Sequence, residues 1–303
     1  QVFATDSTNA SRTLLYDVER LVWDEELCGL FEVPCEALPE VRESSARFGE
    51  TDVAGALPVR LSICGVMGDS QASLFAQRCY QPGEAKATFG SGTSVLLNVG
   101  QDFRPSSAGA VVALAWVLEG RPTYALEGII NYSSATIAWL KDQVGLIGDA
   151  AETDALARSV DDPGGVYLVP AFSGLSAPYW NANARAAIVG MTAHTQKAHI
   201  VRAALEAISY QIRDVLDMMR DARGVTPRML YADGGPTRNE FLMQFTADIT
   251  GDELVVADVP ESSPLGAAMA GLLGLGVVGS LDELAKLPRK TRTYRPQMAA
   301  NKV

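Results

Sequence analysis

From residue 61 onward, the sequence alternates short apolar runs with longer segments of helical periodicity, which limits the folds open to the chain. The runs are rich in β-branched or small apolar residues and are bounded by glycine, proline or polar residues, as strands are. They cover residues 61–66, 85–90, 94–100, 108–118, 122–128, 165–172 and 228–235. Strands that alternate with helices favour a layered α/β domain.

Three helices are predicted in the same region. The strongest pattern covers residues 199–222, where apolar residues recur every three or four positions along one face. A second helix covers residues 238–251 and ends at Gly251, a residue type that commonly terminates helices. The third, residues 264–276, has small residues on every side and is therefore expected to pack tightly against a neighbour.

The first 60 residues have a different pattern. Residues 1–5 predict a strand, and residues 13–50 are polar, acidic and helical in pattern until prolines interrupt them. The chain has no initial methionine and begins in a pattern typical of the middle of a domain. We place a domain boundary between residues 57 and 61, so that one domain ends there and a second domain follows.

Charge and cysteine usage narrow the function classes. The net charge of −11 repels nucleic acids and anionic membrane surfaces, so we expect a small-molecule partner and neither of these. No apolar run approaches the ~20 residues of a membrane span, and the first residues do not form a signal peptide. Four cysteines without paired spacing indicate reduced thiols and a cytoplasmic protein. A homo-oligomer remains open.

One carboxylate stands where proton transfer could take place. The two histidines, His194 and His199, have no suitable partners nearby in the sequence, so a histidine triad or a histidine-bound metal is not indicated. Asp69 follows an apolar strand-like run and precedes a helix-like stretch. A carboxylate at that position could act as a general base for a hydroxyl. The alternative is an ordinary helix N-cap.

Two glycine-rich turns complete the candidate site. Residues 90–94 (Gly-Ser-Gly-Thr-Ser) lie between two predicted strands, where N–H groups and hydroxyls can form an anion-binding nest. The alternative is an ordinary hairpin turn. Residues 233–235 (Asp-Gly-Gly) join a strand to a helix, which suits a nucleotide lying over the helix N-terminus or, alternatively, a simple tight turn. Three such junctions in one α/β domain favour phosphate chemistry.

The sequence also resembles a known family, the FGGY carbohydrate kinases, over essentially its whole length. Residues 5–13 and 166–192 are most similar to the branch of the family that phosphorylates glycerol. The family's second signature is matched by Ala186, Ile188, Gly190, Met191, His199, Ile200, Ala203, Ala204, Leu205 and Glu206.

The resemblance implies a fold and a set of site residues. The fold is a ribonuclease-H-like ATPase domain of the actin and hexokinase type, with a mixed sheet and flanking helices. Residues 1–60 would be the end of the family's N-terminal domain, and residues 61–303 its C-terminal nucleotide-binding domain. Asp69 corresponds to the catalytic base and, through water, to a ligand of Mg²⁺. The positions that bind phosphate and nucleotide correspond to Gly90, Ser91, Gly92, Ser134, Gly234, Gly235, Pro236 and Asn239.

The sequence departs from the glycerol-specific pattern at three positions. Ser70 and Ser94 stand where those members carry a glutamine and an aromatic residue that line the glycerol site, and Ala138 replaces a glutamine near the nucleotide. The two serines shorten the side chains and enlarge the substrate pocket. Because polar pockets discriminate through matched hydrogen bonds, changed polar groups suggest a changed substrate.

The expected function is the ATP- and Mg²⁺-dependent phosphorylation of a hydroxyl of a small polyol or ketose. The family's first phosphate loop and its other polyol contacts are not found, so the 303 residues alone are expected to be inactive and to self-associate through an exposed apolar face. One alternative is a non-catalytic nucleotide-binding or regulatory module descended from such a kinase, against which Asp69 argues. Another is an actin-like structural ATPase, against which the second signature argues.

Overall fold

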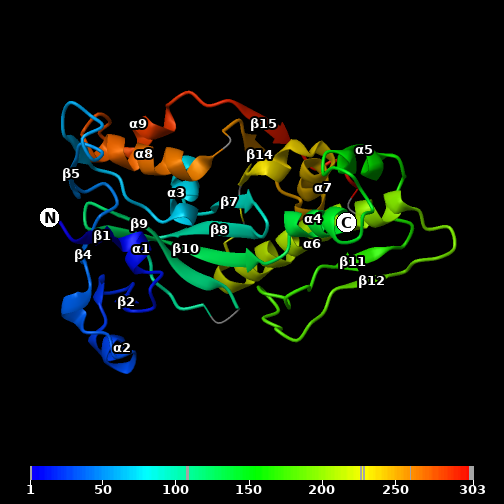
Figure 1. Cartoon of the computed structure of the whole chain (residues 1–303), viewed down its shortest axis with the longest axis horizontal. Helices are drawn as coiled ribbons and strands as arrows, with labels where there is room; N and C mark the ends of the chain where they lie inside the picture. The colour runs from blue at the N-terminus through cyan, green and yellow to red at the C-terminus, as the bar shows by residue number, and fades with distance from the viewer. Residues whose placement is uncertain (1, 107–108, 226, 228, 260, 300–303) are drawn as a thin grey trace.

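The computed structural model describes residues 2–106, 109–225, 227, 229–259 and 261–299. Its centre is a seven-stranded sheet with helices packed on both faces (Figure 1). Gln1, Ala108 and Arg228, which the sequence pattern placed in strands, lie outside the described residues. In pairing order the strands are β15 (Thr291–Tyr294), β14 (Leu254–Ala257), β13 (Met229–Asp233), β7 (Glu84–Phe89), β8 (Thr93–Gly100), β10 (Arg121–Ile130) and β9 (Val111–Leu118).

The sheet is mixed, as predicted. β13 pairs in parallel with β14 and β7, whereas β7, β8, β10 and β9 pair antiparallel in that order and β15 is an antiparallel edge strand. Thr88 near the end of β7 lies opposite Asp233 at the end of β13. The two turns that follow these strands, at residues 90–92 and 234–235, therefore emerge at the same edge of the sheet.

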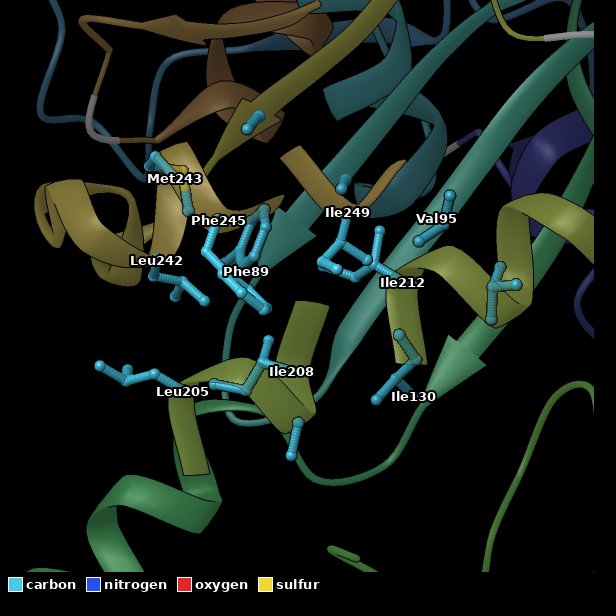
Figure 2. Packing of buried hydrophobic residues seen from close by; sticks show 14 of the residues in the cluster. Phe89, Val95, Ile130, Leu205, Ile208, Ile212, Leu242, Met243, Phe245 and Ile249 are labelled. Carbon is cyan, nitrogen blue, oxygen red and sulfur yellow. The ribbon is translucent and has the colours of Figure 1, made fainter. Parts of the chain in front are cut away.

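One face of the sheet is covered by α6 (Lys197–Arg223) and α7 (Glu240–Thr250). Successive residues of a strand point to opposite faces, so every second residue of β7 joins this core. Figure 2 shows Phe89 of β7 close to Ile208 and Ile212 of α6. The apolar face predicted for the long helix is the face that packs on the sheet.

The ends of α6 explain one of the two histidines. The helix begins two residues before the predicted position because Gln196 and His199 form a capping box, in which His199 Nδ1 accepts a hydrogen bond from Gln196 N at 2.9 Å. It ends at Gly224, which has a left-handed φ of 64°. His199 therefore has a structural role at the start of the helix.

The opposite face is covered by α3 (Asp69–Ala76) and α8 (Ser262–Gly274), which also pack against each other. A Cβ on Gly266 would lie 1.8 Å from the Ala72 carbonyl oxygen, so only glycine allows this approach. The small residues of 264–276 thus pack closely against the helix that begins with Asp69.

The segment before β7 is built from short elements. The helical pattern of residues 13–50 produces only one short α-helix, α2, because Pro34 and Pro39 follow it and disfavour its continuation. The predicted strands at 61–66 and 165–172 shorten to three residues each. The remaining strands and helices of the whole chain are β1 (Ala4–Asp6), α1 (Ser7–Ala10), β2 (Tyr16–Asp17), β3 (Val22–Trp23), α2 (Glu25–Leu30), β4 (Glu40–Arg42), β5 (Gly49–Thr51), β6 (Leu61–Ile63), α4 (Ser134–Asp142), α5 (Glu152–Arg158), β11 (Tyr167–Val169), β12 (Ala187–Val189) and α9 (Leu281–Ala285), with the 3-10 helices η1 (Cys35–Ala37) and η2 (Gly235–Arg238). Within the described part of the chain, no helix combines the length and apolar character needed to cross a membrane.

Candidate active site

Asp69 is the first residue of α3 and is exposed. β6 already ends at Ile63, so Asp69 follows an extended segment and not the strand end that the sequence predicted. Gly68 occupies the N-cap position without any side-chain cap, and Asp69 Oδ1 accepts a hydrogen bond from Ser70 N at 2.7 Å. The carboxylate therefore lies one position inside the helix start, and the backbone of its own neighbour fixes its direction.

Residues from the start of the chain hold this helix start in place. Thr8 Oγ1 accepts a hydrogen bond from Gly68 N at 2.7 Å and donates to Asp6 Oδ2 at 2.6 Å. Asp6 also accepts from Ser44 Oγ at 2.6 Å, and its side chain is fully buried. Because a buried, fully engaged carboxylate resists displacement, the backbone just before Asp69 has a rigid anchor.

The turn at residues 90–92 connects the antiparallel strands β7 and β8, so it is a hairpin turn. A hairpin turn can also bind a ligand. The Gly90 carbonyl oxygen accepts hydrogen bonds from Ser134 Oγ at 2.6 Å and from Ser134 N at 3.2 Å, and Ala135 N donates to the Ser91 carbonyl at 3.1 Å. A Cβ on Gly92 would lie 2.4 Å from the Ile130 carbonyl oxygen. The turn therefore lies directly against the start of α4 and the end of β10.

A cavity of about 310 Å³ opens beside Asp69. The predicted site residues that line it are Asp69, Ser70, Gly90, Gly92 and Ser94. Thr93 lines it as well, and neither Thr93 Oγ1 nor Ser94 Oγ has a hydrogen-bond partner among the described residues. Buried hydroxyls without partners are costly unless a ligand satisfies them. The cavity thus suits a small ligand with several hydroxyl groups.

Three charged residues of this cavity were missed by sequence reasoning. Arg12 and Glu127 form an ion pair at 2.5 Å, in which the Glu127 side chain is 3% exposed. Lys86 lies in the middle of β7 and is 1% exposed. Burial lowers the pKa of the Lys86 ammonium, and the Asp233 and Glu127 carboxylates oppose that shift. A lysine that alternates with the buried alanines of β7 was the one signal that could have pointed to this residue.

A second, larger cavity of about 560 Å³ is lined by residues of α4, α5, α6 and the segment that leads into α7. Ser134, Gly235, Pro236 and Asn239 line it, and Ala138 enlarges it where a longer side chain would reach in. Ile137, Leu205, Ile208 and Leu242 give it an apolar wall, and Lys141, Asp142, Asp154 and Arg238 add charged groups. A pocket with an apolar wall and a few polar groups is typical of small-molecule sites.

Gly234 fixes the distance between the two turns. Its φ is +99°, and a Cβ there would lie 2.0 Å from the Phe89 carbonyl oxygen, so no other residue type fits. Asn239 caps α7, because its Oδ1 accepts a hydrogen bond from Leu242 N at 2.8 Å, and its Nδ2 donates to Thr153 Oγ1 at 3.0 Å. The strand-to-helix turn is therefore tight, and its far side forms a wall of the larger cavity.

The 90–92 turn connects the walls of the two cavities. Gly90 and Gly92 line the smaller cavity, while Ser134, which binds the Gly90 carbonyl, lines the larger one. All predicted site residues except Ser91 and Gly234 line one cavity or the other. Ser91 lies at the exposed tip of the turn, and Gly234 packs against the backbone of Phe89, the residue that precedes the turn.

Comparisons with known proteins agree with this geometry. A model of the C-terminal domain of the FGGY family of carbohydrate kinases matches residues 85–275, and the model of that family's N-terminal domain matches residues 1–76. The chain is 45% identical over 298 residues to glycerol kinase 1 of Thermotoga maritima and 43% identical over 302 residues to the glycerol kinase of Clostridium beijerinckii. These alignments cover 98% and 100% of this chain but only 60% of each relative.

Solved structures show the same likeness. The glycerol kinase of Plasmodium falciparum with ADP superposes with a TM-score of 0.91 at 36% identity, covering 99% of this chain and 60% of that protein. A xylulose kinase from Lactobacillus acidophilus has a TM-score of 0.84 at 22% identity, covering 97% and 60% respectively. At that identity the second likeness shows the fold alone. Both support the predicted actin and hexokinase type of domain.

Proposed function

Because the chain belongs to the FGGY family of carbohydrate kinases, we propose that its protein transfers the γ-phosphoryl group of ATP to a hydroxyl of a small polyol or sugar. The observation that carries the proposal is the arrangement of the two cavities. Asp69 lies in the smaller one, and the 90–92 turn separates it from the larger one. A polyol beside Asp69 and a nucleotide in the larger cavity would meet at that turn.

In this proposal Asp69 is the general base. Its exposed carboxylate can accept the proton of the attacking hydroxyl, while Ser91, exposed at the tip of the 90–92 turn, would contact the transferred phosphates. Ser70 and Ser94 would contact the polyol. Positioning and charge stabilisation provide most of the catalysis in phosphoryl transfer, so the rigid anchor of the Asp69 helix serves the reaction.

The nucleotide would occupy the larger cavity. Its apolar wall suits an adenine ring, and Gly235, Pro236 and Asn239 would lie against the adenosine part. Gly234 would bring that turn close to the phosphates without a side chain in the way. The P. falciparum relative was solved with ADP, which supports an adenine nucleotide as the phosphoryl donor.

The residues also fit a magnesium ion held through water. The described residues contain no group of three or more His, Cys, Asp or Glu side chains placed to bind a metal. Mg²⁺ usually keeps several waters and is bound through one or two carboxylates and the substrate phosphates, so the single carboxylate of Asp69 is sufficient from this chain. Bound there, the ion would neutralise phosphate charge.

The substrate is expected to be larger than glycerol. Ser70 and Ser94 leave room in the cavity, and the hydroxyls of Thr93 and Ser94 have no protein partner among the described residues. A polyol or ketose of four or five carbons could fill the space and bind these hydroxyls. We expect such a compound to have the highest kcat/KM in a panel of polyols and ketoses, and glycerol at the top of the panel would contradict this prediction.

The proposed function is tested with the protein at its full encoded length. ADP formation that depends on an added polyol or ketose, followed by a coupled assay, would support it. The competing view, a non-catalytic nucleotide-binding module, predicts ADP binding without any polyol-dependent turnover. The 43–45% identity to glycerol kinases favours the enzyme.

Four free cysteines support a reducing compartment such as the cytoplasm.

A further inference from the structure

Lys86 has a position that the proposed reaction does not yet use. It lies on β7 between two alanines of the core, but its own side chain points to the opposite face, in the wall of the cavity beside Asp69. In the sheet it is opposite Tyr231 on β13 and Leu96 on β8. Burying a lysine almost completely costs free energy, so its ammonium group must make interactions that offset this cost.

The ammonium group of Lys86 begins a series of hydrogen bonds in which each group donates to the next. Lys86 Nζ donates to Thr88 Oγ1 at 2.9 Å. Ser73 Oγ donates its single hydrogen to Asp233 Oδ2 at 2.9 Å. In the contact of 3.1 Å between the two hydroxyls, Thr88 must therefore be the donor and Ser73 the acceptor. The chain runs from the ammonium through two hydroxyls to a buried carboxylate.

This chain connects the parts of the site that must stay in register. Ser73 is four residues after Asp69 on α3, so both side chains lie on the same face of that helix. Thr88 lies two residues before Gly90, and Asp233 immediately precedes Gly234. The hydrogen bonds thus join the helix of the proposed base to the strand ends that carry both turns.

The charges in the cavity indicate that the Lys86 ammonium sets the direction of these hydrogen bonds. The other basic residue that lines the cavity is Arg12, whose guanidinium is already paired with Glu127 at 2.5 Å. Lys86 instead donates to a neutral hydroxyl, which polarises the two O–H groups that follow toward Asp233. Without the ammonium, Thr88 and Ser73 could rotate to other acceptors and the face of α3 would lose its anchor.

We propose that Lys86 is a positioning residue for phosphoryl transfer, whose ammonium group orders the Thr88–Ser73–Asp233 chain and thereby fixes the Asp69 face of α3 against the 90–92 turn. The inference rests on the proposed kinase function. Lys86 acts through other groups and does not need to contact the substrate. Its loss therefore affects the rate of transfer more than the binding of either reactant.

The test compares Lys86→Met with Thr88→Val and Ser73→Ala in the protein at its full encoded length. Each change removes one member of the chain and keeps a similar shape. We expect kcat to fall roughly 10–100-fold while KM for ATP stays within about threefold, since misplacement of reacting groups by 1 Å can cost about 10² in rate. Lys286→Met, a change at an exposed lysine on the far end of α9, is the matched control and should leave kcat unchanged.

The kcat of a double variant shows whether these residues act together on the position of α3 or independently of one another. If the hydrogen bonds act as one unit, the double variant Lys86→Met/Ser73→Ala loses little more activity than either single variant, whereas independent effects would multiply. Multiplied losses, or retention of more than half of kcat in both Thr88→Val and Ser73→Ala, would overturn the proposal. If Lys86→Met fails to fold, as judged by its melting curve, the two hydroxyl variants decide. An inactive wild-type protein would instead refute the kinase function itself.

Discussion

Asp69→Asn is expected to lower kcat by roughly 10²–10⁴-fold, the usual cost of losing a general base. Asparagine has nearly the same size and can still accept the hydrogen bond from Ser70 N, so the start of α3 should keep its geometry. It cannot accept a proton from the attacking hydroxyl. Steady-state kinetics with the preferred polyol measure the loss.

The nucleotide provides the internal control for this variant. The larger cavity does not include Asp69, so the Kd for ADP, measured by calorimetry, should change by less than about threefold. Asp221→Asn, on the exposed side of α6, is a matched change far from the turns and should have normal turnover. An Asp69→Asn protein that kept more than half of its activity would show that the carboxylate serves only the helix start.

Gly266→Ala is expected to have the second large effect, although it adds only one methyl group. Its Cβ would lie 1.8 Å from the Ala72 carbonyl oxygen, so α8 and α3 must move apart. Overpacking of this kind costs about 1–3 kcal/mol of the free energy of unfolding. Because α3 carries Asp69, we also expect kcat to fall by up to ~10²-fold. Urea denaturation and steady-state kinetics measure the two effects.

Gly271→Ala on the same helix is the control. The nearest atom to its added Cβ would be 3.8 Å away, an ordinary contact, and alanine favours the helix by up to about 1 kcal/mol. This variant should be as stable as the wild type or more stable, with normal turnover. Equal destabilisation of both variants would mean that the close approach at Gly266 is not what limits the packing of the two helices.

The sequence predicted best where one physical rule decides the outcome. The regular spacing of apolar residues located α6 to within two residues, and small residues predicted the close packing of α8. The polar segment 13–50 was harder, because its helical pattern has too few apolar contacts to extend beyond Glu25–Leu30. The strand pattern at 61–66 also overestimated β6, since an extended segment without a ladder partner has the same composition.

Within the site, the turns were predictable and the charges were not. Gly92 and Gly234 lie where the backbone approaches another strand closely, and glycine is the residue type that indicates such a contact in a sequence. The Arg12–Glu127 pair joins residues 115 positions apart, and no local pattern indicates that they meet. Lys86 was overlooked because a lysine in a strand usually marks a solvated face. Only the sheet, which orients that residue toward the cavity wall, reveals its neighbours.

The hydrogen bond from Gly68 N to Thr8 and the ion pair between Arg12 and Glu127 both connect residues on the two sides of the boundary predicted at 57–61. A chimera that joined the residues before this boundary from one family member to the residues after it from another would take the two partners of each contact from different proteins. Exchange of residues 6–12 without 68–127 would leave Glu127 buried without its counter-charge. Recombination within the family is therefore expected to retain these two segments as one inherited unit.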